Sequence, residues 1–312
     1  MNHAERTSRT IRQLLAAAVA CALLAVTASA CDRTGGLTSG QRSGQAGGHT
    51  TGGQASAARP AQQAAPAASP TLVPAPSGVT PSASPSPRPQ DQPLAGDVVA
   101  IDPGHNGGNA AHPDIVNQLV NVITEQKPCD TTGTETDAGY PEHAFSFDVA
   151  SRLAAILRKQ GARVVLTRDN DTGTGPCITQ RAAIGNRAHA DAAISIHADG
   201  GPPGGTGFEV IEPGLVPGYT DKIIAPSRRL GLDIRAAYHT NTGEPYSDYL
   251  GTDGLDVRTD LGGLNLSAVP KVFIECANMR NSADAARLTS AAFRQRVAAA
   301  LAAGLVAFLH GQ

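Results

Sequence analysis

The chain has 312 residues, with 25 Lys and Arg against 27 Asp and Glu, but these averages cover three segments of different composition. Residues 96–312 have an ordinary globular composition, carry a net charge of −6 and are long enough for one α/β domain. An acidic domain without a basic stripe argues against nucleic acid as a partner, and the lack of a second long apolar run argues against a multi-span membrane protein.

Residues 1–31 have the pattern of an export signal. Three arginines in the first 12 residues precede an apolar run that ends in Ala28-Ser29-Ala30. Those three residues suit an ordinary signal peptidase, whereas Cys31 after two small residues resembles a lipobox, in which the cysteine is lipidated. We therefore expect an exported protein of the cell envelope, either lipid-anchored through Cys31 to the outer face of the cytoplasmic membrane or secreted or periplasmic. An uncleaved membrane-anchoring helix is the remaining alternative.

Residues 32–95 are predicted to form a disordered linker. They contain 10 Pro, many Gly, Ser, Ala and Gln, only five Leu or Val, and no Phe, Tyr or Trp. A segment with so little apolar surface cannot form a core. As a flexible coil it would span roughly 45 Å, and we interpret it as a passive tether between the leader and the domain.

Strand and helix patterns alternate through residues 96–312. Short apolar runs predict strands, and an apolar face repeating every three to four residues predicts helices. This alternation predicts a single α/β domain with a mostly parallel, twisted sheet and helices on both faces. The predicted strands are 97–102, 162–167, 192–196, 207–211 and 271–274, and the predicted helices are 141–160, 178–190, 219–240 with a break near Pro226, and 288–309.

Two histidines and two glutamates are expected at one edge of this sheet. His105 follows the first strand, His197 the third and Glu275 the last, while Glu142 lies in the first turn of the first helix. The carboxyl ends of parallel strands form the usual active-site edge. Two His and one carboxylate, with water in the fourth position, are the ligands of a catalytic zinc, and a second Glu can act as general base. Each residue alone has an ordinary structural explanation, but four at one edge favour a metal site.

Several motifs in the same order resemble the type-3 family of bacterial cell-wall hydrolases, the zinc-dependent N-acetylmuramoyl-L-alanine amidases. The resemblance covers about residues 97–310. It implies Zn²⁺ bound by His105, Glu142 and His197, Glu275 as catalytic base, and hydrolysis of the amide between N-acetylmuramic acid and L-alanine in peptidoglycan. The matching residues are 100–105, Glu142 before an apolar helix, 165–168, Arg181 with Asn186 and Asp191, 195–198, and 270–281.

The segment that leads to Glu142 leaves one choice open. Glu135 and Asp137 lie in the same stretch, so the choice of Glu142 as the ligand depends on its position at the start of a helix. Two other functions also remain open. One is a zinc peptidase that cuts stem-peptide bonds, and the other is a catalytically silent wall-binding regulator. We expect a monomer.

The cysteines predict one disulfide. Cys21 leaves with the signal, Cys31 is lipidated or terminal, and Cys276 lies inside a predicted strand. The remaining pair, Cys129 and Cys177, lies in loops of a domain exported to an oxidising compartment. We therefore predict a Cys129–Cys177 disulfide that steadies the segment leading to Glu142.

Overall fold

The computed structural model describes residues 92–311, so the export signal, Cys31 and nearly all of the linker lie outside the described residues. The domain is built on a six-stranded sheet in the order β4-β1-β5-β8-β6-β7. Strands β4, β1, β5 and β8 are parallel, as predicted. The six strands are β1 Val98–Pro103, β4 Arg163–Leu166, β5 Ala192–Asp199, β6 Glu209–Pro213, β7 Leu255–Arg258 and β8 Lys271–Asn278.

Two strands run against the rest of the sheet. β6 pairs antiparallel with β8, and β7 pairs parallel with β6. Only nine residues connect β5 to β6, and a parallel crossover needs a dozen residues or more. β6 therefore starts at the edge where β5 ends and runs back across the sheet. This brings the first residue of β6, Glu209, to the edge where the sequence places His197 and Glu275.

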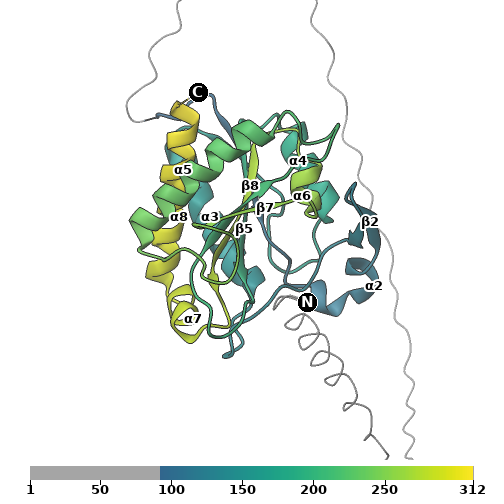
Figure 1. Cartoon of the computed structure of the whole chain (residues 1–312), viewed down its shortest axis with the longest axis vertical. Coiled ribbons are helices and arrows are strands. Elements are labelled where there is room, and N and C mark those ends of the chain that lie inside the picture. Colours follow the sequence, from purple (N-terminus) through teal and green to yellow (C-terminus); the bar gives the residue numbers. More distant parts are fainter. Residues whose placement is uncertain (1–91, 312) are drawn as a thin grey trace, which may run out of the picture. The chain divides into compact units, whose positions relative to one another are not determined.

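Helices cover both faces of the sheet, as the sequence predicts. On one face, α3 (Glu142–Lys159) packs over β4, β1 and β5, and α5 (Ile224–Thr242) packs over β6 and β8. α8 (Ala291–His310) packs against both α3 and α5. The opposite face carries the shorter helices α4 (Ile178–Arg187) and α6 (Gly262–Asn265), and Figure 1 shows the two groups of helices on either side of the sheet. The large hydrophobic core lies on the α3, α5 and α8 face.

Helix α8 is apolar around most of its surface because it is a core helix. Within residues 92–311 it is the one helix whose length and composition would allow it to cross a membrane. Its large apolar side chains are buried against α3 and α5, which accounts for its composition without a membrane. These side chains are Phe293, Val297, Leu301, Leu305 and Phe308.

Several boundaries differ from the prediction for local reasons. The expected helix 288–309 begins three residues later, as α8, because Ser290 caps α8 by accepting a hydrogen bond from the Phe293 backbone N–H. The short helix before it, α7 (Ser282–Leu288), was not predicted. Pro226 does not break α5. It lies in the first turn, where its missing N–H would have no partner. Leu94, ahead of the expected start at residue 96, is fully buried, and its N–H bonds to the Gln160 carbonyl.

The segment between β1 and α3 forms several small elements that the sequence did not predict. A 3₁₀ turn (Asn109–Ala111) and α2 (Pro113–Val116) are followed by a hairpin of β2 (Leu119–Asn121) and β3 (Gln126–Pro128). β7 and α6 were also not predicted. All are three or four residues long, too short to show a periodic pattern.

Candidate metal centre

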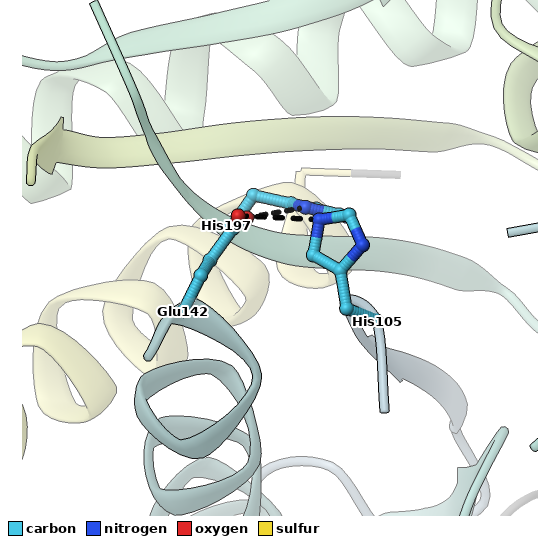
Figure 2. Close-up of side chains that lie close together, drawn as sticks. All are labelled: His105, Glu142 and His197. Carbon is cyan, nitrogen blue, oxygen red and sulfur yellow. Dashed lines mark hydrogen bonds and ion pairs between the residues drawn. The ribbon is translucent and has the colours of Figure 1, made fainter. Parts of the chain in front are cut away.

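Three side chains from distant parts of the chain converge at the carboxyl edge of the sheet. His105 follows β1, Glu142 is the first residue of α3, and His197 lies near the end of β5. The Glu142 carboxylate faces both rings from one side (Figure 2), with Oε2 3.2 Å from His105 Nε2 and Oε1 2.9 Å from His197 Nδ1. One ligand atom from each of the three residues lies within 4.8 Å of the others. The structure thus brings together the two histidines and the carboxylate that the sequence singled out.

The loop that carries His105 is held by two buried arginines. His105 has a φ of 56°, a left-handed conformation that is uncommon for a residue with a side chain. Arg168 donates to the carbonyls of Pro103 and Gly104, and Arg181 donates to those of Pro103 and His105. The three consecutive carbonyls are therefore fixed by charged donors, which stabilises the unusual backbone and aims the imidazole at the site.

The ring of His105 is oriented through its second nitrogen. Nδ1–H donates to the Thr131 carbonyl at 3.0 Å, and Asp130 Oδ1 lies 3.3 Å from the same nitrogen. Arg181 holds Asp130 at 2.9 Å. Burial alone would lower the pKa of His105, but the carboxylates of Glu142 and Asp130 raise it to about 10 in the metal-free site. With Nδ1 occupied, Nε2 is the nitrogen left for a metal.

Glu142 is positioned by backbone donors as well as by its helix. Its carboxylate accepts hydrogen bonds from the Thr134 N–H at 2.9 Å and the Ala198 N–H at 3.3 Å. The start of α3 also favours negative charge. Burial would raise the pKa of Glu142, but His105 and His197 hold it well below its ordinary value. The group is therefore a carboxylate, the form that binds a metal.

His197 is held between an aromatic ring and a glycine. Its imidazole stacks on Phe273 of β8, with the ring centroids 5.2 Å apart and the planes at 16°. On the other side lies Gly104, where a Cβ atom would overlap the His197 ring. Gly133 lies against the other two ligands, because a Cβ atom at this position would overlap the side chains of Glu142 and His105. These glycines allow the backbone to approach the three ligands closely.

Glu275 lies beside the three residues and is not one of the clustered ligands. It pairs with His197 across the β5–β8 register and lines the same cavity of about 330 Å³. Its Oε2 is buried and has no hydrogen-bond partner within residues 92–311. Burial, together with the charges of Glu142, Asp199 and Glu209, raises the pKa of Glu275 well above its ordinary value. A carboxyl group with a raised pKa is suited to proton transfer.

The other candidate residues lie outside this cluster. Asp137 is exposed and pairs with Arg280 at 3.0 Å, and Glu135 forms a backbone bridge to Pro141. Neither joins the two histidines. Cys276 is a buried free thiol in β8, on the core side of the sheet.

A buried charged network on the α4 and α6 face supports the site. Asp102 accepts hydrogen bonds from Arg181, Ser195 and Thr167 and lies 3.4 Å from Lys271. Burial would raise the pKa of Asp102, but Lys271 and Arg181 hold it well below its ordinary value. Arg181 joins this network to Asp130 and so to His105.

Sequence reasoning missed three contributors to the site. Asp130 and Thr134 lie in an irregular segment without a pattern that marks them, and they act through a carboxylate and a backbone N–H. Glu209 did leave a signal, because it is an acidic residue between Phe208 and Val210 in an apolar run. The predicted Cys129–Cys177 disulfide is confirmed, and it links residues 48 apart, next to Asp130 and at the start of α4.

Comparison with known proteins agrees with this geometry. The family model described as N-acetylmuramoyl-L-alanine amidase, Amidase_3, matches residues 99–307. N-acetylmuramoyl-L-alanine amidase Rv3717 of Mycobacterium tuberculosis is 42% identical over 219 residues, covering 70% of this chain and 89% of the relative. The crystal structure of the amidase Ami1 of Mycobacterium smegmatis is similar with a TM-score of 0.66 and 39% identity, covering 70% of this chain and 99% of that one. Ami1 of Mycobacterium abscessus gives 0.65 and 40%, with coverages of 69% and 100%. The chain therefore belongs to the Amidase_3 family and is an N-acetylmuramoyl-L-alanine amidase.

Proposed function

We propose that this amidase is a zinc enzyme that hydrolyses the amide between the lactyl group of N-acetylmuramic acid and L-alanine in peptidoglycan. In this proposal His105, Glu142 and His197 hold the zinc and Glu275 is the general base. The observation that carries it is the convergence of three ligand atoms within 4.8 Å beside a fourth carboxyl group with an unpartnered oxygen.

The chemistry of the donor set fits zinc. Two imidazoles and one carboxylate leave a fourth position open, as in catalytic zinc sites. The outer nitrogen of His105 is bound by a carbonyl and a carboxylate, an arrangement typical of metal-ligating histidines. When bound, zinc would lower the pKa of a water molecule toward about 7 and polarise the amide carbonyl.

The protein's own residues supply the proton transfers. Glu275 accepts a proton from the attacking water and passes it to the nitrogen of the leaving L-alanine. In the metal-free site its burial and the negative charges near it favour the protonated form. A bound zinc would favour the carboxylate, so Glu275 could accept the proton and then release it to the leaving amine. The Phe273 ring and Gly104 hold His197 next to Glu275, its register partner on β8. No serine or cysteine nucleophile is needed, and Cys276 lies on the other face of the sheet.

The test is a comparison of Glu275→Gln with Glu212→Gln. Glu212 is a buried glutamate of β6 that pairs with Arg228 away from the cavity, so its variant is a matched control. We expect Glu275→Gln to remain folded and zinc-loaded but to lose about 10²- to 10⁴-fold in the rate of release of L-alanine-terminated peptides from peptidoglycan. Fragments are identified by mass spectrometry and zinc by elemental analysis. Loss of zinc would make Glu275 a ligand, and near-normal activity would refute its role as base.

We also propose that the domain acts outside the cytoplasm, anchored through a lipid on Cys31. A cell-wall substrate and the Cys129–Cys177 disulfide both suit an oxidising compartment. Labelling cells with a fatty-acid analogue should tag the wild-type protein and leave Cys31→Ser unlabelled. An unlabelled and fully soluble wild-type protein would instead support cleavage after Ala30.

A further inference from the structure

A second glutamate lies directly opposite the proposed general base. β6 and β8 are antiparallel, and Glu209 is the register partner of Glu275. Directly opposite residues of an antiparallel pair have Cβ atoms about 4.5–5.5 Å apart and point to the same face. The next pair on that face is Ile211 with Phe273, and both line the cavity with Glu275. Glu209 therefore lies on the same face of the sheet as these three cavity-lining residues, next to Glu275.

Glu209 is buried with no direct hydrogen bond to its carboxyl group. The residue is 1% exposed, and neither Oε1 nor Oε2 has a donor at hydrogen-bond geometry within residues 92–311, although the Ser247 hydroxyl lies near enough to lower its pKa. Glu275 Oε2, on the facing strand, is also without such a donor. An ionised carboxylate buried without a partner is strongly unfavourable, and two adjacent ones repel each other. Three unpartnered carboxyl oxygens on facing positions are explained when the two groups share a proton.

We infer that Glu209 is a positioning residue for Glu275: its carboxyl group carries a proton and shares it with the Glu275 carboxylate, directly or through one water. This inference depends on the proposed role of Glu275 as general base. The shared proton orients Glu275 and offsets part of the cost of its burial. It is not consumed, because the proton that Glu275 takes from water goes on to the leaving amine.

The surroundings of Glu209 favour the protonated form at neutral pH. Burial, with the nearby Asp199 and Asp256, raises the pKa of Glu209 to about 8, against the opposing effects of the Ser247 hydroxyl and the Arg258 guanidinium. Arg258 is paired with Asp260, which accepts hydrogen bonds from its Nε and Nη2 at 2.8 and 2.7 Å. The groups that face Glu209 are Glu275 on β8, Asp199 at the end of β5, Ser247 and Tyr249 in the loop after α5, and Asp256 and Arg258 on β7.

Three variants of the zinc-loaded protein test this inference. Glu209→Gln keeps a donor that cannot ionise, Glu209→Ala removes the donor, and Glu212→Gln is the control on the same strand. Glu212 has similar burial but packs on the opposite face, against Gly231 of α5. We expect Glu209→Ala to lose about 10- to 100-fold in kcat at pH 7, as for other residues that orient a catalytic group, with zinc content unchanged.

The pH profile separates positioning from a structural role. In the wild type, ionisation of Glu209 removes the donor and adds a charge beside Glu275, so kcat should fall as the pH rises through about 8. Glu209→Gln should retain most of the neutral activity and keep its plateau at least one pH unit further into the alkaline range. Glu212→Gln should follow the wild type.

Infrared difference spectra between the wild type and each variant supply a measurement that does not depend on turnover. The wild type at pH 7 should show the carbonyl stretch of a protonated carboxyl group that disappears in Glu209→Gln and persists in Glu212→Gln. Identical pH profiles for the wild type and Glu209→Gln, or no such band, would overturn the inference. These results are separate from the test of Glu275, since an active Glu275→Gln would refute the general base itself whatever Glu209 does.

Discussion

The Cys129–Cys177 disulfide should stabilise the domain mainly through the unfolded chain. The bridge closes a loop of 48 residues, for which the chain-entropy model gives about 4 kcal/mol of free energy of unfolding. In the folded protein the same two segments are also held by the Ile178 N–H on the Cys129 carbonyl at 2.8 Å and by the Arg181–Asp130 ion pair. We therefore expect the native geometry next to His105 to survive loss of the bridge.

The double variant Cys129→Ser, Cys177→Ser, measured with saturating zinc, tests this expectation. Chemical denaturation followed by circular dichroism should give a free energy of unfolding about 4 kcal/mol lower than that of the oxidised wild type. For a domain of this size the melting temperature should fall by roughly 10 °C. Reduced wild type is the matched control and should behave like the variant. Equal stability of variant and oxidised wild type would refute the entropic reasoning, and loss of zinc would show that the bridge orders the site itself.

Three further predictions concern the metal centre. His197→Ala should lose most of its zinc affinity while remaining folded, because three protein ligands are the usual minimum for a catalytic site, and undiminished zinc by elemental analysis would contradict the assignment. Gly104→Ala should also lose zinc, since its Cβ would displace the His197 ring, whereas Gly204→Ala, which has open space, should bind zinc normally in a titration. In the metal-free protein the raised pKa of His105 stabilises the fold fully below pH 6.5, and this contribution is lost as the pH rises through about 10. Denaturation of chelator-treated protein from pH 6 to 10 should show this decline, and a flat profile would contradict it.

The sequence predicted the fold because the long elements carry strong patterns. The alternation of apolar strands with amphipathic helices such as α3 is enough to require a mostly parallel sheet covered on both faces. The segment between His105 and Glu142 was not predictable, because its turns and two-stranded hairpin are three or four residues long and are stabilised by contacts distant in sequence. Asn109, for example, donates to the Thr131 carbonyl, the same oxygen that orients His105.

The sequence indicated the correct edge of the sheet for residues that follow parallel strands. His105, His197 and Glu275 come at or after the ends of β1, β5 and β8, where parallel topology brings them to one edge. Glu142 lies there because α3 begins at that edge. Asp130 follows no such rule, since it lies in an irregular segment beside the disulfide and is held by Arg181, which binds both Asp130 and Asp102.

Glu209 shows that looking for site residues only after the ends of strands is not sufficient in a mixed sheet. In a strand antiparallel to the others, the first residues lie at the edge where the parallel strands end. β6 is such a strand, because the nine-residue connection from β5 is too short for a parallel crossover. Its first residue is therefore beside Glu275, although it precedes a strand in the sequence. For a chain in which a short loop follows a ligand-bearing strand, the start of the next strand should be searched for polar residues as carefully as the ends of the others.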